Sequence, residues 1–136
     1  MEMQTPRLVA LPGQEPYLEP FWTRVFEDNG RPHEAALITS PEYAMKRLLA
    51  AGQTRIFQLG PVAREGEHGR WHHPEFCLLE WYRAEAGYLD MLADTKALLS
   101  FLAVELRGQT DFTWQGKPLS LAQELWEKHA VSQAFI

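Results

Sequence analysis

Cysteine is almost absent from this 136-residue sequence, because Cys77 is the only one and no disulfide can form within the chain. Such usage agrees with a reducing compartment. The N-terminus carries Glu2 and no apolar signal region. No apolar run approaches the roughly 20 residues that a helix needs to cross a bilayer. We therefore expect a cytoplasmic protein with no membrane partner.

Basic residues are also scarce. The 13 Lys and Arg against 18 Asp and Glu give a formal net charge of −5, and the pI is about 5.5. Domains that grip nucleic acid usually carry a basic patch, so charge does not suggest binding to a duplex or to tRNA. A hydrophobic content of 46% with 12% aromatic residues argues against disorder. The length fits one domain of roughly 100–200 residues.

The first half of the chain predicts strands, a hairpin and a helix. Residues 1–8 predict a short strand, and the Pro- and Gly-rich residues after it predict an irregular connection. Apolar stretches at 21–26 and 35–39 flank Asn29-Gly30, a dipeptide that favours a hairpin turn. Ser40-Pro41-Glu42 then predicts the start of a helix, through a capping serine, a first-turn proline and an acid at the positive end of the dipole.

The second half predicts a longer hairpin and two more helices. The expected elements are strands at 55–63 and 76–83, a helix at 88–106 ended by Gly108, and a last helix at 121–129. Ser120 and Gln123 form a capping-box pattern for the last of these. The apolar run 76–79 predicts a strand buried on both faces with Cys77 as an inert core thiol. The leucines of 89–106 predict a stripe that faces the core or, alternatively, an interface. Together these elements favour an α+β fold with a largely antiparallel sheet.

The polar loop at 64–73 contains the residues most suited to binding chemistry. Two arginines, three histidines and Trp71 lie between two apolar strands. Guanidinium groups bind phosphate oxygens, and an aromatic face stacks on a base. This composition favours a nucleotide site, and the alternative is a solvated hairpin tip. The histidine spacing fits no strong zinc pattern, so we expect no metal site there.

Several spaced blocks of the sequence resemble class II lysyl-tRNA synthetases. The wording is most similar to the branch that lysylates elongation factor P and lacks an anticodon-binding domain. The blocks that carry the resemblance are Ile38–Tyr43, Met45–Leu48, Phe57–Leu59, Gly69–Phe76 and Leu79–Arg83. The resemblance implies a class II synthetase-like, mostly antiparallel sheet flanked by helices. Residues 1–136 would be the N-terminal part of its catalytic core, with the end of motif 1 at 1–8 and motif 2 at 56–83.

The resemblance also implies roles for individual residues. Arg64 matches the motif 2 arginine that contacts the α-phosphate and the substrate carboxylate, which makes it the catalytic candidate. The other implied ATP contacts are Glu67, His72, His73 and Phe76. The implied substrate contacts are Glu42, Glu80 and Tyr82. A lysine-type substrate needs such carboxylates, because a buried ammonium is costly unless it is paired.

The sequence departs from the family pattern at several positions. Gly66 stands where motif 2 has a glutamate, and either flanking acid, Glu65 or Glu67, replaces it if the loop shifts by one residue. His73 stands in place of an asparagine, and Ala63 in place of an aromatic residue. Motif 3 and the acids that hold Mg²⁺ are not found up to Ile136, so we expect the fold to be incomplete and the chain alone to be inactive or strongly impaired.

The reaction that the resemblance implies uses ATP and Mg²⁺ to activate lysine or β-lysine as an aminoacyl-adenylate. Elongation factor P is the expected acceptor, and a homodimer through residues 1–8 is expected. Two alternatives remain open at this point. One is a lysyl-tRNA synthetase core with tRNA-Lys as acceptor, and the other is a truncated, non-catalytic module that binds a nucleotide or a partner.

Overall fold

The computed structural model describes residues 1–122, 124 and 126–134, which belong to two compact units, Met1–Glu85 and Ala86–Ile136. Both units contain helix together with antiparallel strands, and this content confirms the α+β prediction. Among the helices in the described part of the chain, none is long and apolar enough to span a membrane.

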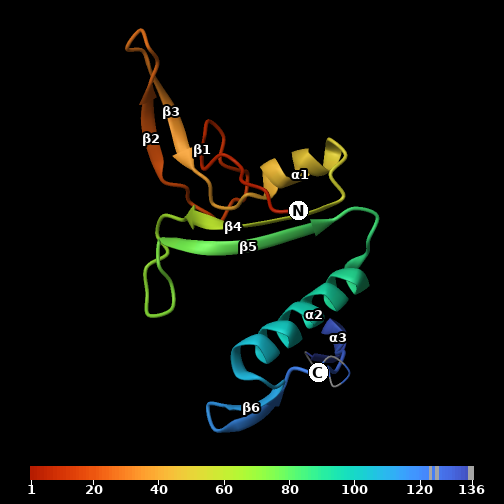
Figure 1. Cartoon of the computed structure of the whole chain (residues 1–136). Coiled ribbons are helices and arrows are strands. Elements are labelled where there is room, and N and C mark those ends of the chain that lie inside the picture. The colour runs from red at the N-terminus through yellow and green to blue at the C-terminus, as the bar shows by residue number, and fades with distance from the viewer. Residues whose placement is uncertain (123, 125, 135–136) are drawn as a thin grey trace. The chain divides into compact units, whose positions relative to one another are not determined.

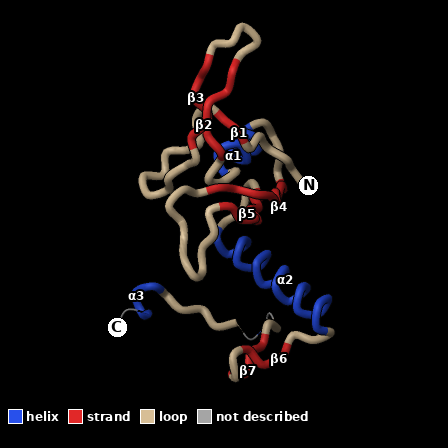
Figure 2. Tube along the Cα trace, turned by 90° about the vertical axis from the view of Figure 1, so that its left-hand side faces the viewer, coloured by secondary structure: helices blue, strands red, loops and turns tan. Residues whose placement is uncertain are grey.

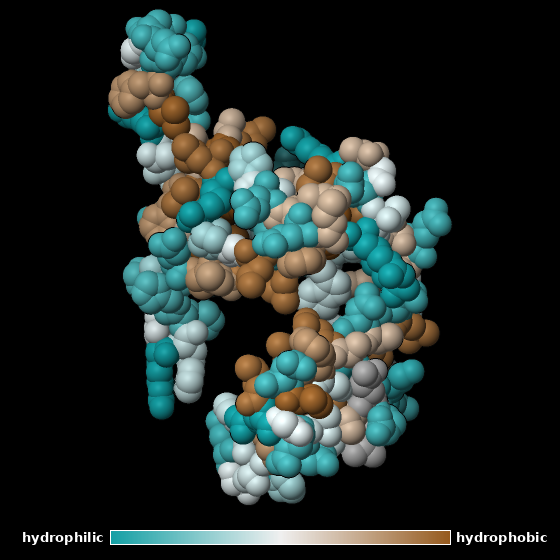
Figure 3. Space-filling view, in the orientation of Figure 1, coloured by the Kyte–Doolittle hydropathy of each residue, from teal (hydrophilic) through white to brown (hydrophobic). Residues whose placement is uncertain are grey.

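A small antiparallel sheet occupies one side of the first unit. It is formed by β1 (Leu8–Val9), β2 (Trp22–Phe26) and β3 (Pro32–Leu37) in the order β1-β3-β2. The β2–β3 hairpin projects away from the rest of its unit (Figure 1), and its tip is hydrophilic (Figure 3). Gly30 has a φ of 79°, a left-handed value that glycine adopts without strain. The hairpin predicted around Asn29-Gly30 is therefore confirmed.

The strand predicted over residues 1–8 is wrong in its extent. Glu2 makes an isolated parallel bridge to Phe57, and β1 begins only at Leu8. Between them the backbone finds other partners, since the Thr5 N–H donates to the side-chain Oε1 of Gln58 at 3.0 Å. Pro6 has no N–H to offer a neighbouring strand. A continuous ladder therefore cannot run through these residues.

The remaining helix and strands of the first unit are α1 (Glu42–Ala50), β4 (Arg55–Ala63) and β5 (Glu75–Arg83). In the described residues, β4 and β5 form a two-stranded antiparallel sheet in which Gln58 lies opposite Glu80. The helix α1 lies along one side of this pair (Figure 1). It ends before Gly52, whose φ is 95°. The predicted helix, both strands and the loop between them are confirmed.

The two faces of the β4–β5 sheet differ in burial. Side chains alternate along a strand, and the inner face of β4 is buried at Ile56, Gln58 and Val62. On the outer face Leu59 is 59% exposed and Cys77 is also exposed. The predictions of a strand buried on both faces and of a core thiol at Cys77 are therefore wrong. An unbroken apolar run does not distinguish a covered face from an open one.

The second unit contains a long helix and a short hairpin (Figure 2). Its elements are α2 (Tyr88–Arg107), β6 (Asp111–Trp114), β7 (Lys117–Ser120) and α3 (Val131–Ala134). The predicted helix and its end at Gly108, which has a φ of 75°, are confirmed. The core reading of the leucine stripe is wrong, because Leu89 and Leu106 are exposed and the buried residues of α2 are Ser100 and Ala103, and the interface reading stays a prediction.

The chain after α2 differs most from the sequence prediction. The β6–β7 hairpin was not predicted, although Gln115 and Gly116 both have positive φ, at 50° and 79°, as a two-residue hairpin turn requires. The helix predicted over 121–129 is wrong for the described residues of that range. A helix instead appears at Val131–Ala134. Gln123, the second member of the predicted capping box, lies outside the described residues.

Candidate functional site

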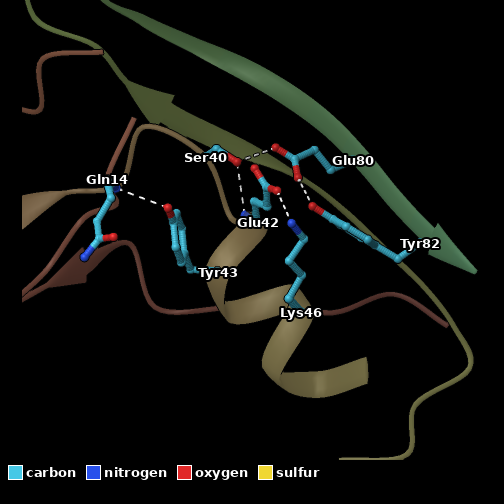
Figure 4. A network of polar contacts seen from close by, with 7 residues as sticks. All are labelled: Gln14, Ser40, Glu42, Tyr43, Lys46, Glu80 and Tyr82. Carbon is cyan, nitrogen blue, oxygen red and sulfur yellow. Dashed lines mark hydrogen bonds and ion pairs between the residues drawn. The ribbon is translucent and has the colours of Figure 1, made fainter. Parts of the chain in front are cut away.

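Glu80 is the centre of a polar cluster between β5 and the start of α1 (Figure 4). Its Oε1 accepts a hydrogen bond of 2.5 Å from the Ser40 hydroxyl, and its Oε2 accepts one of 2.7 Å from the Tyr82 hydroxyl. Glu80 and Tyr82 are two residues apart on one strand, so their side chains share the inner face of the sheet. Both carboxylate oxygens of Glu80 are thus held in a fixed orientation by neutral donors.

Tyr82 acts in this cluster as a hydrogen-bond donor. Burial and the hydrogen bond to Glu80 raise the pKa of the Tyr82 hydroxyl well above its usual range. A phenol with a raised pKa keeps its proton at neutral pH. The negative charge of the pair is therefore located on Glu80.

Ser40 connects the strand to the helix. Besides donating to Glu80, its Oγ accepts the backbone N–H of Glu42 at 3.0 Å. This bond satisfies one of the free N–H groups at the start of α1, as a capping serine does. It also places the Glu42 side chain on the first turn of the helix, and Figure 4 shows the Glu42 and Glu80 carboxylates directed into the same space.

Glu42 differs from Glu80 in its partner. Its Oε1 lies 2.5 Å from the Nζ of Lys46, one helical turn along α1. The hydrogen bond and the charge of Glu42 raise the pKa of the Lys46 ammonium. The sequence interpretation named Glu42, Glu80 and Tyr82 together, and the structure brings all three into one cluster. It did not single out Ser40 or Lys46 as site residues, although the i, i+4 spacing of Glu42 and Lys46 is a readable signal for their pairing.

Replacing Ser40 by alanine tests how much this hydroxyl stabilises the unit. Ser40 is 9% exposed, and Ser40→Ala removes both of its hydrogen bonds. We expect the free energy of unfolding to fall by about 0.5–2 kcal/mol, the range for loss of a capping hydroxyl. Urea denaturation measures the change. Ser132→Ala, an exposed position in α3, is the control, and an equal effect of both substitutions would contradict the capping role.

Tyr43 ties a second segment to the helix beside the cluster. Its hydroxyl accepts the backbone N–H of Gln14 at 3.2 Å (Figure 4). A cavity of about 450 Å³ lies along this side of α1 between the helix and residues 5–14. The otherwise irregular segment is therefore anchored next to Ser40 and Glu42.

A second cluster surrounds Arg64 at the end of β4. The guanidinium donates from Nε to the carbonyl of Thr39 at 3.1 Å. It lies 5.1 Å from the centroid of the Phe76 ring, and its Nη1 lies 3.6 Å from the carboxylate of Glu67. The backbone N–H of Arg64 donates to the carbonyl of Pro74 at 2.8 Å. Arg64, Glu67 and Phe76 therefore form one group on the inner face of the sheet, with the guanidinium only partly exposed.

The two histidines that the sequence assigned to nucleotide binding lie in the loop between β4 and β5. His72 and His73 are exposed, and the ring of His73 contacts the backbone carbonyl of Glu75 at 3.1 Å. Arg70 lies over the exposed ring of Trp71 at 4.9 Å. Within residues 1–122, 124 and 126–134, no group of three His, Cys, Asp or Glu side chains is arranged to hold a metal ion.

Comparison with known proteins shows which family this chain is similar to. Residues 1–135 match the model of the tRNA synthetases class II (D, K and N). The elongation factor P–(R)-beta-lysine ligase of Baumannia cicadellinicola is 41% identical to this chain over 102 residues, which cover 73% of the chain and 31% of the relative. The proteins of the same name from Yersinia enterocolitica and Yersinia pestis are 43% identical over 101 residues with the same coverage. The chain thus spans about a third of the length of these relatives.

Proposed function

Because the chain belongs to the class II tRNA synthetases (D, K and N), we propose that it forms part of an ATP-dependent ligase that activates lysine or β-lysine and transfers it to elongation factor P. The observation that carries the proposal is the cluster of Ser40, Glu42, Glu80 and Tyr82. The matched relatives bear the name of a β-lysine ligase acting on elongation factor P. We place this ligase in the cytoplasm.

The acid cluster suits the amino groups of a diamino acid. Glu80 offers a carboxylate whose two oxygens are already oriented by Ser40 and Tyr82. Glu42 offers a second carboxylate at the start of α1, and the ammonium of Lys46 already lies on it. An ammonium that leaves water needs a paired, hydrogen-bonded acceptor. We assign Glu42 and Glu80 to the substrate ammonium groups and Tyr82 to the orientation of Glu80.

The Arg64 group suits the phosphate and base of a nucleotide. A guanidinium binds phosphate oxygens through two parallel N–H donors. The face of Phe76 beneath it provides a surface for stacking a base. Glu67 holds the guanidinium at 3.6 Å and is expected to exchange this contact for the nucleotide. His72 and His73 are expected to contact ATP only after the loop has moved.

The chemistry assigned to these residues is charge neutralisation and positioning. A carboxylate oxygen of the amino acid attacks the α-phosphorus of ATP, the bond from that phosphorus to the β-bridging oxygen breaks, and pyrophosphate leaves. Arg64 offsets the negative charge that develops at the α-phosphate. The acyl group then passes to an amine of the acceptor, and AMP is released.

We propose Mg²⁺ binding and dimerisation as properties of the longest product of the gene. The described residues provide no three-ligand metal group, so residues outside them are expected to hold Mg²⁺, which would neutralise phosphate charge when bound. A second copy is expected to pair through residues 1–8. The longest product of the gene is therefore the protein in which activity is to be measured.

The acceptor is tested by a transfer assay on that longest product. We expect radiolabelled lysine or β-lysine with ATP to label elongation factor P and to leave tRNA-Lys unlabelled. Labelling of tRNA-Lys alone would replace the proposal by a lysyl-tRNA synthetase. Labelling of neither acceptor, with no adenylate formed, would favour a non-catalytic module.

A further inference from the structure

Lys46 is a charged side chain of the acid cluster for which the reaction just described has no role. Its Nζ lies 2.5 Å from the Glu42 Oε1, and both residues belong to the same face of α1 (Figure 4). The Lys46 side chain is 61% exposed and the Glu42 side chain 38% exposed. The ammonium is therefore held by one short contact with Glu42, while the rest of the side chain remains in solvent.

The two carboxylates of the cluster are paired in different ways. Glu80 is satisfied by two neutral hydroxyl donors, and Glu42 is satisfied by an ammonium. A lysine side chain ends in the same chemical group as the substrate that Glu42 is assigned to bind. Exposed ion pairs one helical turn apart are weak, so this contact can open without disturbing the fold.

The negative charge near Lys46 comes from two elements, its own helix α1 and the strand β5. The negative charges of Glu42 and Glu80 both act on the ammonium, the first from α1 and the second from β5, and both raise the pKa of Lys46. Tyr43, the residue after Glu42, acts in the same direction. An incoming ammonium would meet the same field, and it would also meet the positive charge of Lys46 itself.

We propose that Lys46 is an internal competitor for the Glu42 carboxylate. A ligand must displace the Lys46 ammonium from Glu42 with an ammonium of its own. This inference rests on the proposed function, because it assumes that Glu42 binds a substrate ammonium. Lys46 then sets the affinity of the site for diamino ligands. It keeps Glu42 paired while the site is empty, and by returning to Glu42 it favours release of the ligand.

The test is an NMR titration of the longest product of the gene with L-lysine, followed at the backbone amides of α1 and β5. Lys46→Gln removes the competing charge, and we expect it to lower the dissociation constant of lysine by roughly two- to tenfold. Lys46→Arg keeps the charge and is expected to stay within about twofold of the unmodified chain. Lys117→Gln removes the same charge from β7 in the second unit and is the matched control, with no expected change.

A second measurement follows Lys46 directly. The side-chain resonances of Lys46 should move towards those of a free lysine when L-lysine is added, and they should already lie there in Glu42→Gln. If lysine binds with equal or lower affinity to Lys46→Gln than to the unmodified chain, the competitor role is overturned and the proposed function stands. If added lysine shifts no backbone amide resonance of α1 or β5 in any variant, the acid cluster binds no ammonium, and both proposals fail.

Discussion

Arg64→Ala is expected to lower the rate of ATP–pyrophosphate exchange by roughly 100- to 1000-fold in the longest product of the gene, the effect typical of losing one preorganised charge donor. The physical reason is that the guanidinium is held in place before substrate arrives. Thr39 accepts its Nε–H at 3.1 Å, and Phe76 lies beneath it at 5.1 Å. An alanine leaves the charge at the α-phosphate without this neutralising group.

The matched control for this change is Arg70→Ala. Arg70 belongs to the same loop and carries the same charge, but it is exposed and lies over the exposed ring of Trp71. We expect exchange in Arg70→Ala to stay within about threefold of the unmodified protein, because exposed charges act weakly through water. Equal losses in the two variants would mean that Arg64 contributes general charge to the loop and has no special place in the reaction.

Glu80→Gln is expected to raise the KM for lysine in the same exchange reaction by roughly 30- to 1000-fold, from about 2–4 kcal/mol of lost pairing with the substrate ammonium. Glutamine is the informative replacement because it keeps the size of the side chain. Its amide oxygen can still accept a hydrogen bond from Ser40 or Tyr82, so the cluster keeps its geometry while the negative charge disappears.

Glu75→Gln controls for a change of charge on the same strand. Glu75 begins β5, and its contact with Arg7 at 3.4 Å is exposed. We expect its KM for lysine to remain within about twofold of the unmodified value. A KM that is unchanged in Glu80→Gln would remove Glu80 from the substrate site, whatever happens to the turnover number.

Short local signals predicted the central part of the fold well. Ser40-Pro41-Glu42 stands at the start of α1, where Pro41 is the N-cap residue and the Ser40 hydroxyl just before it accepts the Glu42 N–H. Gly52 and Gly108 follow the ends of α1 and α2 with positive φ. Such signals depend on a few neighbouring residues, so they are readable without knowledge of the tertiary structure.

The predictions that failed depended on contacts far along the chain. Whether residues 1–8 form a strand depends on Gln58, whose side chain takes the Thr5 N–H. Whether Cys77 is buried depends on what covers the outer face of β4–β5, and an apolar run contains no information on that point. The exposed leucines of α2 illustrate the same limit. Helical spacing identifies the apolar face of a helix, but it does not show which other element packs on that face.

The sequence predicted the candidate site as two groups of residues, the substrate contacts and the ATP contacts. The hydrogen bonds and ion pairs within each group could be seen only in the three-dimensional structure. Glu42, Glu80 and Tyr82 were named together, but the hydroxyl of Ser40 that joins β5 to α1 is visible only in three dimensions. Lys46 was part of a matching block and received no role, because a sequence does not show that its ammonium lies on Glu42.

The most direct test of the account is ATP–pyrophosphate exchange by the longest product of the gene, measured with lysine, β-lysine and norleucine. Norleucine matches lysine in its carbon chain but lacks the side-chain ammonium that the acid cluster is assigned to bind. We predict exchange with lysine or β-lysine and at least about 100-fold less with norleucine, since an unpaired carboxylate would then remain in the site. Exchange with norleucine at the rate seen with lysine, or no exchange with any of the three, would contradict the account.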